Sequence, residues 1–196
     1  MLYDHRDPMS ELSRKVMDKI DVFRDLIELE KTSISNRSRK LFTLNSLYNA
    51  NKALLGKSKK HEKVLQKEED ACIEYWNNLV VQFKDWEDVK SRKVNPSELR
   101  RDYVHAHGVM LHALGLVGNS LLSNYSKEWK DKIKKLRQID WSRKNSSLWE
   151  GRVMIGGRIS ASPSNLVLTS SIIKQKLDIE LSAEERKLEK QLNGGE

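Results

Sequence analysis

Side chains suited to contacting nucleic acid are concentrated between Lys127 and Arg158. This stretch holds ten of the 36 basic residues of the chain but only four of its 28 acidic residues, so it supplies most of the net charge of +8. Lys and Arg neutralise phosphates, while Asn and Ser position a nucleic acid or contact base edges. The sequence therefore predicts a surface that binds DNA or RNA, formed by Lys127, Lys130, Lys134, Lys135, Arg137, Arg143, Lys144, Asn145, Arg152 and Arg158.

Two other interpretations of the C-terminal half stay open on residue types alone. Trp141 and Trp149 can be core anchors, with the lysines around them forming a solvated helix face. The predicted helices over 169–177 and 182–192 have the dimensions of a helix-turn-helix pair. The second of them carries three glutamates and is charge-balanced, which makes it a poor recognition helix.

The remaining reactive residue types do not form a catalytic pattern. His105, His107 and His112 fall in an apolar stretch that has no Asp or Glu beside them, with His105 and His112 seven residues apart on one helical face. Packing histidines are favoured over a metal site. There is no HExxH, Walker, CxxC or GxSxG pattern. We therefore expect no enzymatic activity, no metal and no cofactor.

The single cysteine bears on the compartment. Cys72 lies on an apolar helical stripe, which favours a buried structural thiol over a reactive one. One cysteine excludes an internal disulfide framework, and a reducing compartment is the simplest interpretation. The sequence contains no run of 18 apolar residues, so it predicts no membrane span. Its N-terminus also lacks the apolar core of a signal peptide. We expect a cytoplasmic protein.

Hydrophobic periodicity and capping residues predict mostly helices. Residues 1–105 carry many charges that nearly balance, which is typical of solvated helix faces. Thr43 and Gly56 bracket the second helix, and Ser182 with Glu185 forms a capping box before the last. The predicted elements are helices over 10–31 with Ser10 as cap, 44–55, 62–91, about 103–122, 126–139, 169–177 with Thr169 as cap and 182–192, a Gly/Ser-rich loop over 141–163 with a helical turn at 148–153, and an extended segment over 164–168.

These elements predict a mainly α fold. The helix over about 103–122 is apolar on nearly all sides, so we expect it at the centre of a multi-helix domain. The C-terminal region combines basic loops with short helices. We expect one helical domain over 1–196, made of a helical core (1–125), a basic helix with a Gly/Ser loop (126–168) and a C-terminal helix pair (169–196).

Several separate motifs resemble the DndB family, the regulatory members of the DNA phosphorothioation system. The resemblance covers most of the chain. Its motifs are the run from Asp140 to Arg152 (DWSRKNSSLWEGR), GGRIS from Gly156, NLVLT from Asn165, YDHRDPM at 3–9, LFTL from Leu41 and HAHGV from His105.

The resemblance implies a DNA-binding transcriptional repressor of the sulfur-modification gene cluster, acting by occupying promoter DNA. The family is defined by an N-terminal domain bearing the string DGQHR, which is absent here. We therefore expect the chain to be the C-terminal part of such a protein. The alternative is a protein-interaction module, in which the helices over 10–31 and 62–91 self-associate or dock on the sulfur-modification enzymes.

Overall fold

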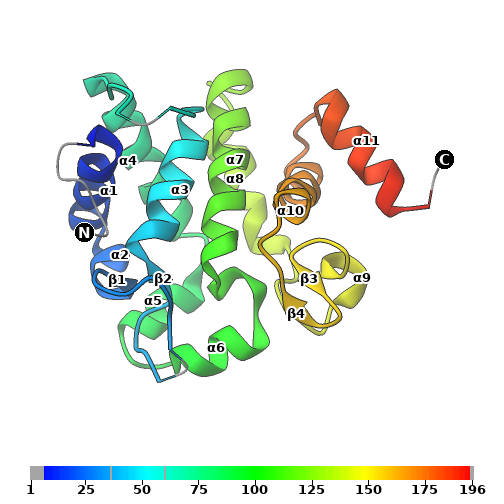
Figure 1. Cartoon of the computed structure of the whole chain (residues 1–196), viewed down its shortest axis with the longest axis horizontal. Coiled ribbons are helices and arrows are strands. Elements are labelled where there is room, and N and C mark those ends of the chain that lie inside the picture. The colour runs from blue at the N-terminus through cyan, green and yellow to red at the C-terminus, as the bar shows by residue number, and fades with distance from the viewer. Residues whose placement is uncertain (1–6, 36, 60, 195–196) are drawn as a thin grey trace.

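The computed structural model describes residues 7–35, 37–59 and 61–194, and over these residues the chain is mainly α-helical, as predicted (Figure 1). None of the described helices is long and apolar enough to cross a membrane. The elements are α1 (Pro8–Lys19), α2 (Asp21–Leu26), β1 (Ile27–Glu28), β2 (Phe42–Thr43), α3 (Leu44–Leu54), α4 (Gln66–Val80), α5 (Lys84–Lys90), α6 (Pro96–Asp102), η1 (Val104–Ala106), α7 (Gly108–Asn124), α8 (Trp129–Ile133), η2 (Lys134–Gln138), α9 (Ser146–Trp149), β3 (Met154–Ile155), β4 (Arg158–Ile159), α10 (Pro163–Lys176) and α11 (Ala183–Leu192).

The apolar helix α7 occupies the centre of the molecule, between α3 and α10 (Figure 1). Its glycines bring it into direct contact with α3. A Cβ atom added at Gly115 would lie 2.3 Å from the carbonyl oxygen of Ala50, and one added at Gly108 would lie 2.2 Å from the Ser46 hydroxyl. Because Gly108, Gly115 and then Gly118 meet successive positions of α3 in the same order, the two helices run parallel.

A buried hydrogen-bond node joins α3 to two neighbouring helices. The Asn51 side-chain oxygen accepts from the Trp76 indole (2.7 Å) and from the Cys72 thiol (3.3 Å), both on α4. Its amide nitrogen donates to the Ser13 hydroxyl on α1 (3.1 Å). All four side chains are buried, so the node satisfies polar groups that would be costly to leave unpaired. Cys72 is thus the structural thiol that the sequence predicts.

Two of the predicted long helices are each broken into two. The segment 10–31 forms α1 and α2, because the backbone of Ile20 between them is extended (φ −104°, ψ 105°). Asp7 caps α1 in place of Ser10, since its carboxylate accepts from the Ser10 backbone N–H (3.1 Å). The segment 62–91 forms α4 and α5, separated by a turn. The breaks fold each apolar stripe back onto the same core.

The C-terminal region differs most from the prediction. The segment 164–168 is helical, not extended, because Ser162 caps α10 by accepting from the Asn165 N–H (3.3 Å) and Pro163 occupies its first turn. Thr169 is a buried residue inside this helix and not its cap. The basic helix over 126–139 is present but shorter, as α8 continuing into the 3₁₀-helix η2. The capping box of Ser182 begins α11, as predicted.

We predict that Gly115→Ala destabilises the protein. Alanine gains up to about 1 kcal/mol in helix propensity, but its Cβ would press on the Ala50 backbone, and overpacking of this kind costs about 1–3 kcal/mol. A lower midpoint in urea unfolding would confirm the close contact. Ser123→Ala, on the exposed side of α7, is the control and should leave the midpoint nearly unchanged.

We also predict that Cys72 is unreactive in the folded protein. Burial raises the pKa of its thiol to about 12, so the nucleophilic thiolate is scarce at pH 8. An aromatic disulfide reagent should release no chromophore from native protein within minutes, and one equivalent after urea is added. Stoichiometric modification of native protein would contradict the buried node.

Candidate nucleic-acid interface

The predicted DNA-binding residues separate into a helical group and a loop group. The helical group lies on α8 and η2 and just before them, and three of its lysines have carboxylate partners. Lys130 lies 2.5 Å from Glu74, Lys134 lies 2.7 Å from Asp131, and Lys135 pairs with Asp178. The remaining members are Arg137, which donates to the Val81 carbonyl (3.2 Å), and the exposed Lys127. Each carboxylate cancels much of the charge that a phosphate would be attracted to.

In the loop group, Arg143 joins two separate segments. Its guanidinium donates to the carbonyls of Arg100 (3.3 Å) and Arg101 (3.2 Å), at the C-terminal end of α6. It also donates to the Gly157 carbonyl (2.7 Å), between β3 and β4. A cation is favourable at a helix C-terminus, where carbonyl groups lack helical partners. Arg143 therefore fastens the β3–β4 hairpin to α6, and the exposed Lys144 follows it in the chain.

Arg152 does not lie on the surface. It is 7% exposed, and its guanidinium donates to both carboxylate oxygens of Glu189 on α11, with one Nη2–Oε2 distance of 2.8 Å. It also donates to the Leu168 carbonyl (3.2 Å). This buried pair holds α11 and α10 against the chain before β3. Arg152 is therefore removed from the predicted DNA-binding set, because a buried guanidinium cannot reach a phosphate.

Asn145 and the two tryptophans have structural contacts. Asn145 is half-buried before α9, where its amide donates to the Asp140 carboxylate (3.2 Å). Trp141 and Trp149 are buried and stack with ring centroids 5.3 Å apart. The two tryptophans are therefore core anchors, which is one of the interpretations that the sequence left open. They place the Arg143–Lys144 segment beside α6.

Arg100 and Arg101 on α6 were missed by the sequence analysis. Arg100 points toward the loop between β1 and β2, where its guanidinium donates to the carbonyls of Lys40 (2.5 Å), Ser35 (3.1 Å) and Ser38 (3.3 Å). This loop, residues 31–40, carries four basic residues and no acidic one, a signal that was available in the sequence. Arg101 is exposed and pairs with Asp102 (2.8 Å).

The 31–40 loop, α6 and the hairpin lie at the same end of the molecule, the lower end in Figure 1. The cations at this end come from the 31–40 loop, from α6, from the Arg143–Lys144 segment and from the hairpin. Only folding brings these four stretches of sequence together. The helical group lies elsewhere, on α8 and η2 behind α7. We call the exposed residues of this end, together with the carbonyl-bonded arginines that support them, the basic end: Arg37, Arg39, Arg100, Arg101, Arg143, Lys144 and Arg158.

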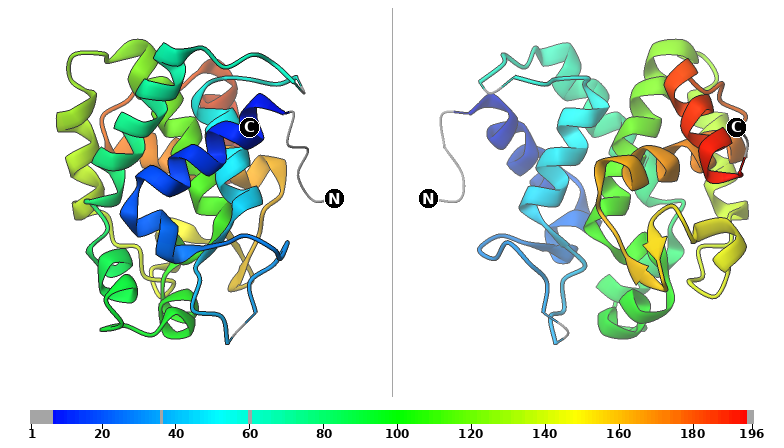
Figure 2. Two further views of the ribbon diagram at one scale, coloured as in Figure 1. Left: turned by 90° about the vertical axis from the view of Figure 1, so that its left-hand side faces the viewer. Right: turned by 45° about the vertical axis from the view of Figure 1, so that its right-hand side comes forward.

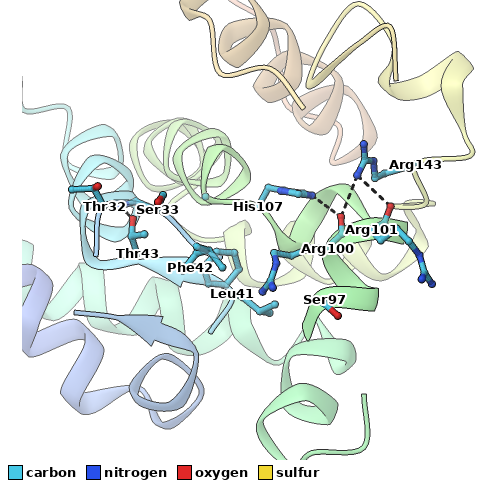
Figure 3. Close-up of a pocket in the computed structure, with 13 residues that line it drawn as sticks. Thr32, Ser33, Leu41, Phe42, Thr43, Ser97, Arg100, Arg101, His107 and Arg143 are labelled. Atoms are coloured by element: carbon cyan, nitrogen blue, oxygen red, sulfur yellow. Dashed lines mark hydrogen bonds between the residues drawn. The ribbon is translucent and has the colours of Figure 1, made fainter. Parts of the chain in front are cut away.

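A pocket of about 720 Å³ opens at the basic end, between the 31–40 loop, α6 and the beginnings of α3 and α7 (Figure 3). The first turns of α3 and α7 contain no acidic residue, so two positive helix ends face this region. His107 lines the pocket and contacts the Arg100 carbonyl through Nε2 (2.8 Å). Burial lowers the pKa of His107 to about 4, so its imidazole is neutral at pH 7.

His105 and His112 lie apart from this pocket. His105 is in η1, before α7 begins, so it does not share a helical face with His112 as predicted. The Trp86 indole donates to His105 Nδ1 (3.1 Å), which leaves the ring proton on Nε2, 3.2 Å from the Asp85 carboxylate. Among the described residues, no three His, Cys, Asp or Glu side chains are grouped to hold a metal ion.

Comparison with known protein families gives one result. A family model named DndB and described as DNA-sulfur modification-associated matches residues 1–180. No curated protein and no solved structure matches the chain.

We predict that Glu189→Ala destabilises the protein strongly, because it leaves the Arg152 charge buried without its partner. Removing one member of a buried ion pair costs about 3–5 kcal/mol. Urea unfolding would measure the loss. The matched control is Asp131→Ala, which breaks the exposed pair with Lys134 and should cost less than about 1 kcal/mol. Equal effects of the two variants would contradict the buried role of Arg152.

Proposed function

The chain belongs to the DndB family and is associated with DNA sulfur modification; we propose that it is a DNA-binding repressor of the gene cluster for that modification. Binding at a promoter blocks transcription by occupancy, so the proposed role needs double-stranded DNA as partner and neither catalysis nor a cofactor. The DNA-contacting surface in this proposal is the basic end.

The observation that carries the proposal is the convergence of cations at one end of the fold. Arg101, Lys144 and Arg158 are exposed there, on three different segments. Arg100 and Arg143 lie among them and hydrogen bond to carbonyls, which orient a guanidinium without cancelling its charge. A DNA duplex presents phosphates on both sides of a groove, so cations on separate segments can contact several at once. The partly exposed Asp102 reduces this charge, through its pair with Arg101.

The helices proposed to mediate self-association use their apolar faces within the chain. Leu12 and Val16 of α1, and Trp76 and Leu79 of α4, are buried in the core. A dimer or docked enzyme would therefore have to use other surfaces. Nothing in the arrangement of α1 and α4 favours the interaction module over DNA binding.

We predict that Lys144→Gln weakens DNA binding at low salt and reduces the slope of log K against log salt by up to about 1, since it removes one phosphate contact. Arg101→Gln should have a smaller effect, because Asp102 already pairs with Arg101. Fluorescence anisotropy with a duplex from the promoter of the gene cluster, titrated at several salt concentrations, measures both quantities.

Lys187→Gln on α11 removes the same charge far from the basic end and serves as the matched control. Lys130→Gln tests the helical group, and its effect should be smaller because Glu74 already neutralises Lys130. If Lys130→Gln weakens binding and Lys144→Gln does not, the interface lies on α8. If no variant changes affinity or slope while circular dichroism shows an intact fold, the proposed function is wrong.

A further inference from the structure

We infer that the β3–β4 hairpin enters the minor groove of DNA, with Ile155 as an apolar wedge and Arg158 as the cation beside it. The inference rests on the proposed function, because it assumes a DNA partner. It goes further in naming the groove, the element that enters it and the deformation of DNA that follows.

The hairpin turn is a two-glycine loop that leaves its tip clear. Gly156 (φ +56°) and Gly157 (φ +73°) both have the positive φ that a tight type I′ hairpin turn requires. A Cβ atom added at either glycine would meet no atom within 4 Å among the residues that the structure describes. The tip is therefore open to solvent on the side where these Cβ atoms would stand.

The two faces of the hairpin have opposite character. Met154 pairs with Ile159, and Ile155 pairs with Arg158. Because side chains alternate along a strand and directly paired residues share a face, Ile155 and Arg158 lie side by side on one face. Met154 is buried and Ile159 packs against the core. Ile155 is 51% exposed and Arg158 is exposed, so the other face presents one branched apolar side chain next to one guanidinium.

The hairpin is held in place before any ligand binds. Arg143 donates to the Gly157 carbonyl (2.7 Å), and the Glu150 carboxylate accepts from the backbone N–H groups of both Gly156 and Gly157. Figure 2 shows the hairpin beside α6, at the basic end. A fixed hairpin loses little conformational freedom on binding. The Glu150 charge opposes the phosphates, while Arg143 contacts the same tip and Arg158 directly follows it.

The chemistry of the tip matches the minor groove better than the major groove. In the major groove Arg158 could pair with a guanine, but an apolar side chain beside it finds only thymine methyl groups to contact. Proteins that bind the minor groove insert Arg into its negative potential and wedge an apolar side chain between base steps, which kinks the duplex. Ile155 and Arg158 supply both parts.

The test measures bending and affinity separately. The full chain is mixed with a promoter duplex carrying donor and acceptor dyes at its two ends. The wild type should raise the transfer efficiency, as a bent duplex brings its ends together. Ile155→Ala should abolish most of that rise and weaken binding about five- to tenfold. Ile155→Met keeps an apolar wedge, so it should retain both the rise in transfer efficiency and the affinity. Leu65→Ala, at a similarly exposed leucine before α4, is the control and should change neither.

A second arm identifies the groove. Replacing G·C by inosine·cytosine pairs in a duplex removes the guanine amino group from the minor groove and leaves the major groove edges unchanged. This replacement should strengthen wild-type binding, and the gain should shrink in Arg158→Gln. If the wild type binds and bends DNA but neither Ile155→Ala nor the inosine replacement has an effect, the hairpin inference is overturned and the proposed function stands. If the wild type binds no duplex, both fail.

Discussion

The fold depends on the close parallel contact between α3 and α7. An apolar helix that is buried on nearly all sides must touch its neighbours closely, and Gly115 allows its backbone to approach that of Ala50. Side-by-side parallel helices place like ends of their dipoles together. Both helices begin at the basic end, without an acidic residue in either first turn. The electrostatic character of this end therefore follows partly from the packing at the centre of the molecule.

The helical class and several helix boundaries follow from the sequence because they depend on neighbouring residues. Thr43 and Ser182 cap α3 and α11 as predicted, since a cap needs only the N–H groups two or three residues later. The break at Ile20 was not predictable in this way. Its neighbours continue the apolar stripe, and the chain turns there because the core lies on both sides of it. Val167 indicates a strand by residue type, but the local cap of Ser162, with Pro163 after it, begins a helix there.

The candidate site was only partly predictable because ion pairs form between distant segments. The charge excess over 127–158 is real, but the partners of Lys130 and Lys135 lie at Glu74 and Asp178, outside that stretch. Conversely, Arg101 lies in a stretch whose charges nearly balance, and folding brings it beside Lys144 and the hairpin. Charge counted along a sequence identifies which residues are available for a site. Their spatial partners decide which of them can attract a phosphate.

The arginines of this chain show how partner chemistry decides the outcome. Arg152 hydrogen bonds to a carboxylate, so the pair is neutral, and its role is to hold α11. Arg143 and Arg100 hydrogen bond to carbonyls, which are dipoles without net charge. Their charge stays in the field of the molecule even though their donors are occupied, and it acts over roughly 8 Å at physiological salt. The same contacts that fix the 31–40 loop and the hairpin to α6 therefore also supply positive potential, which is why the positioning of the basic end and its attraction for an anionic partner cannot be separated.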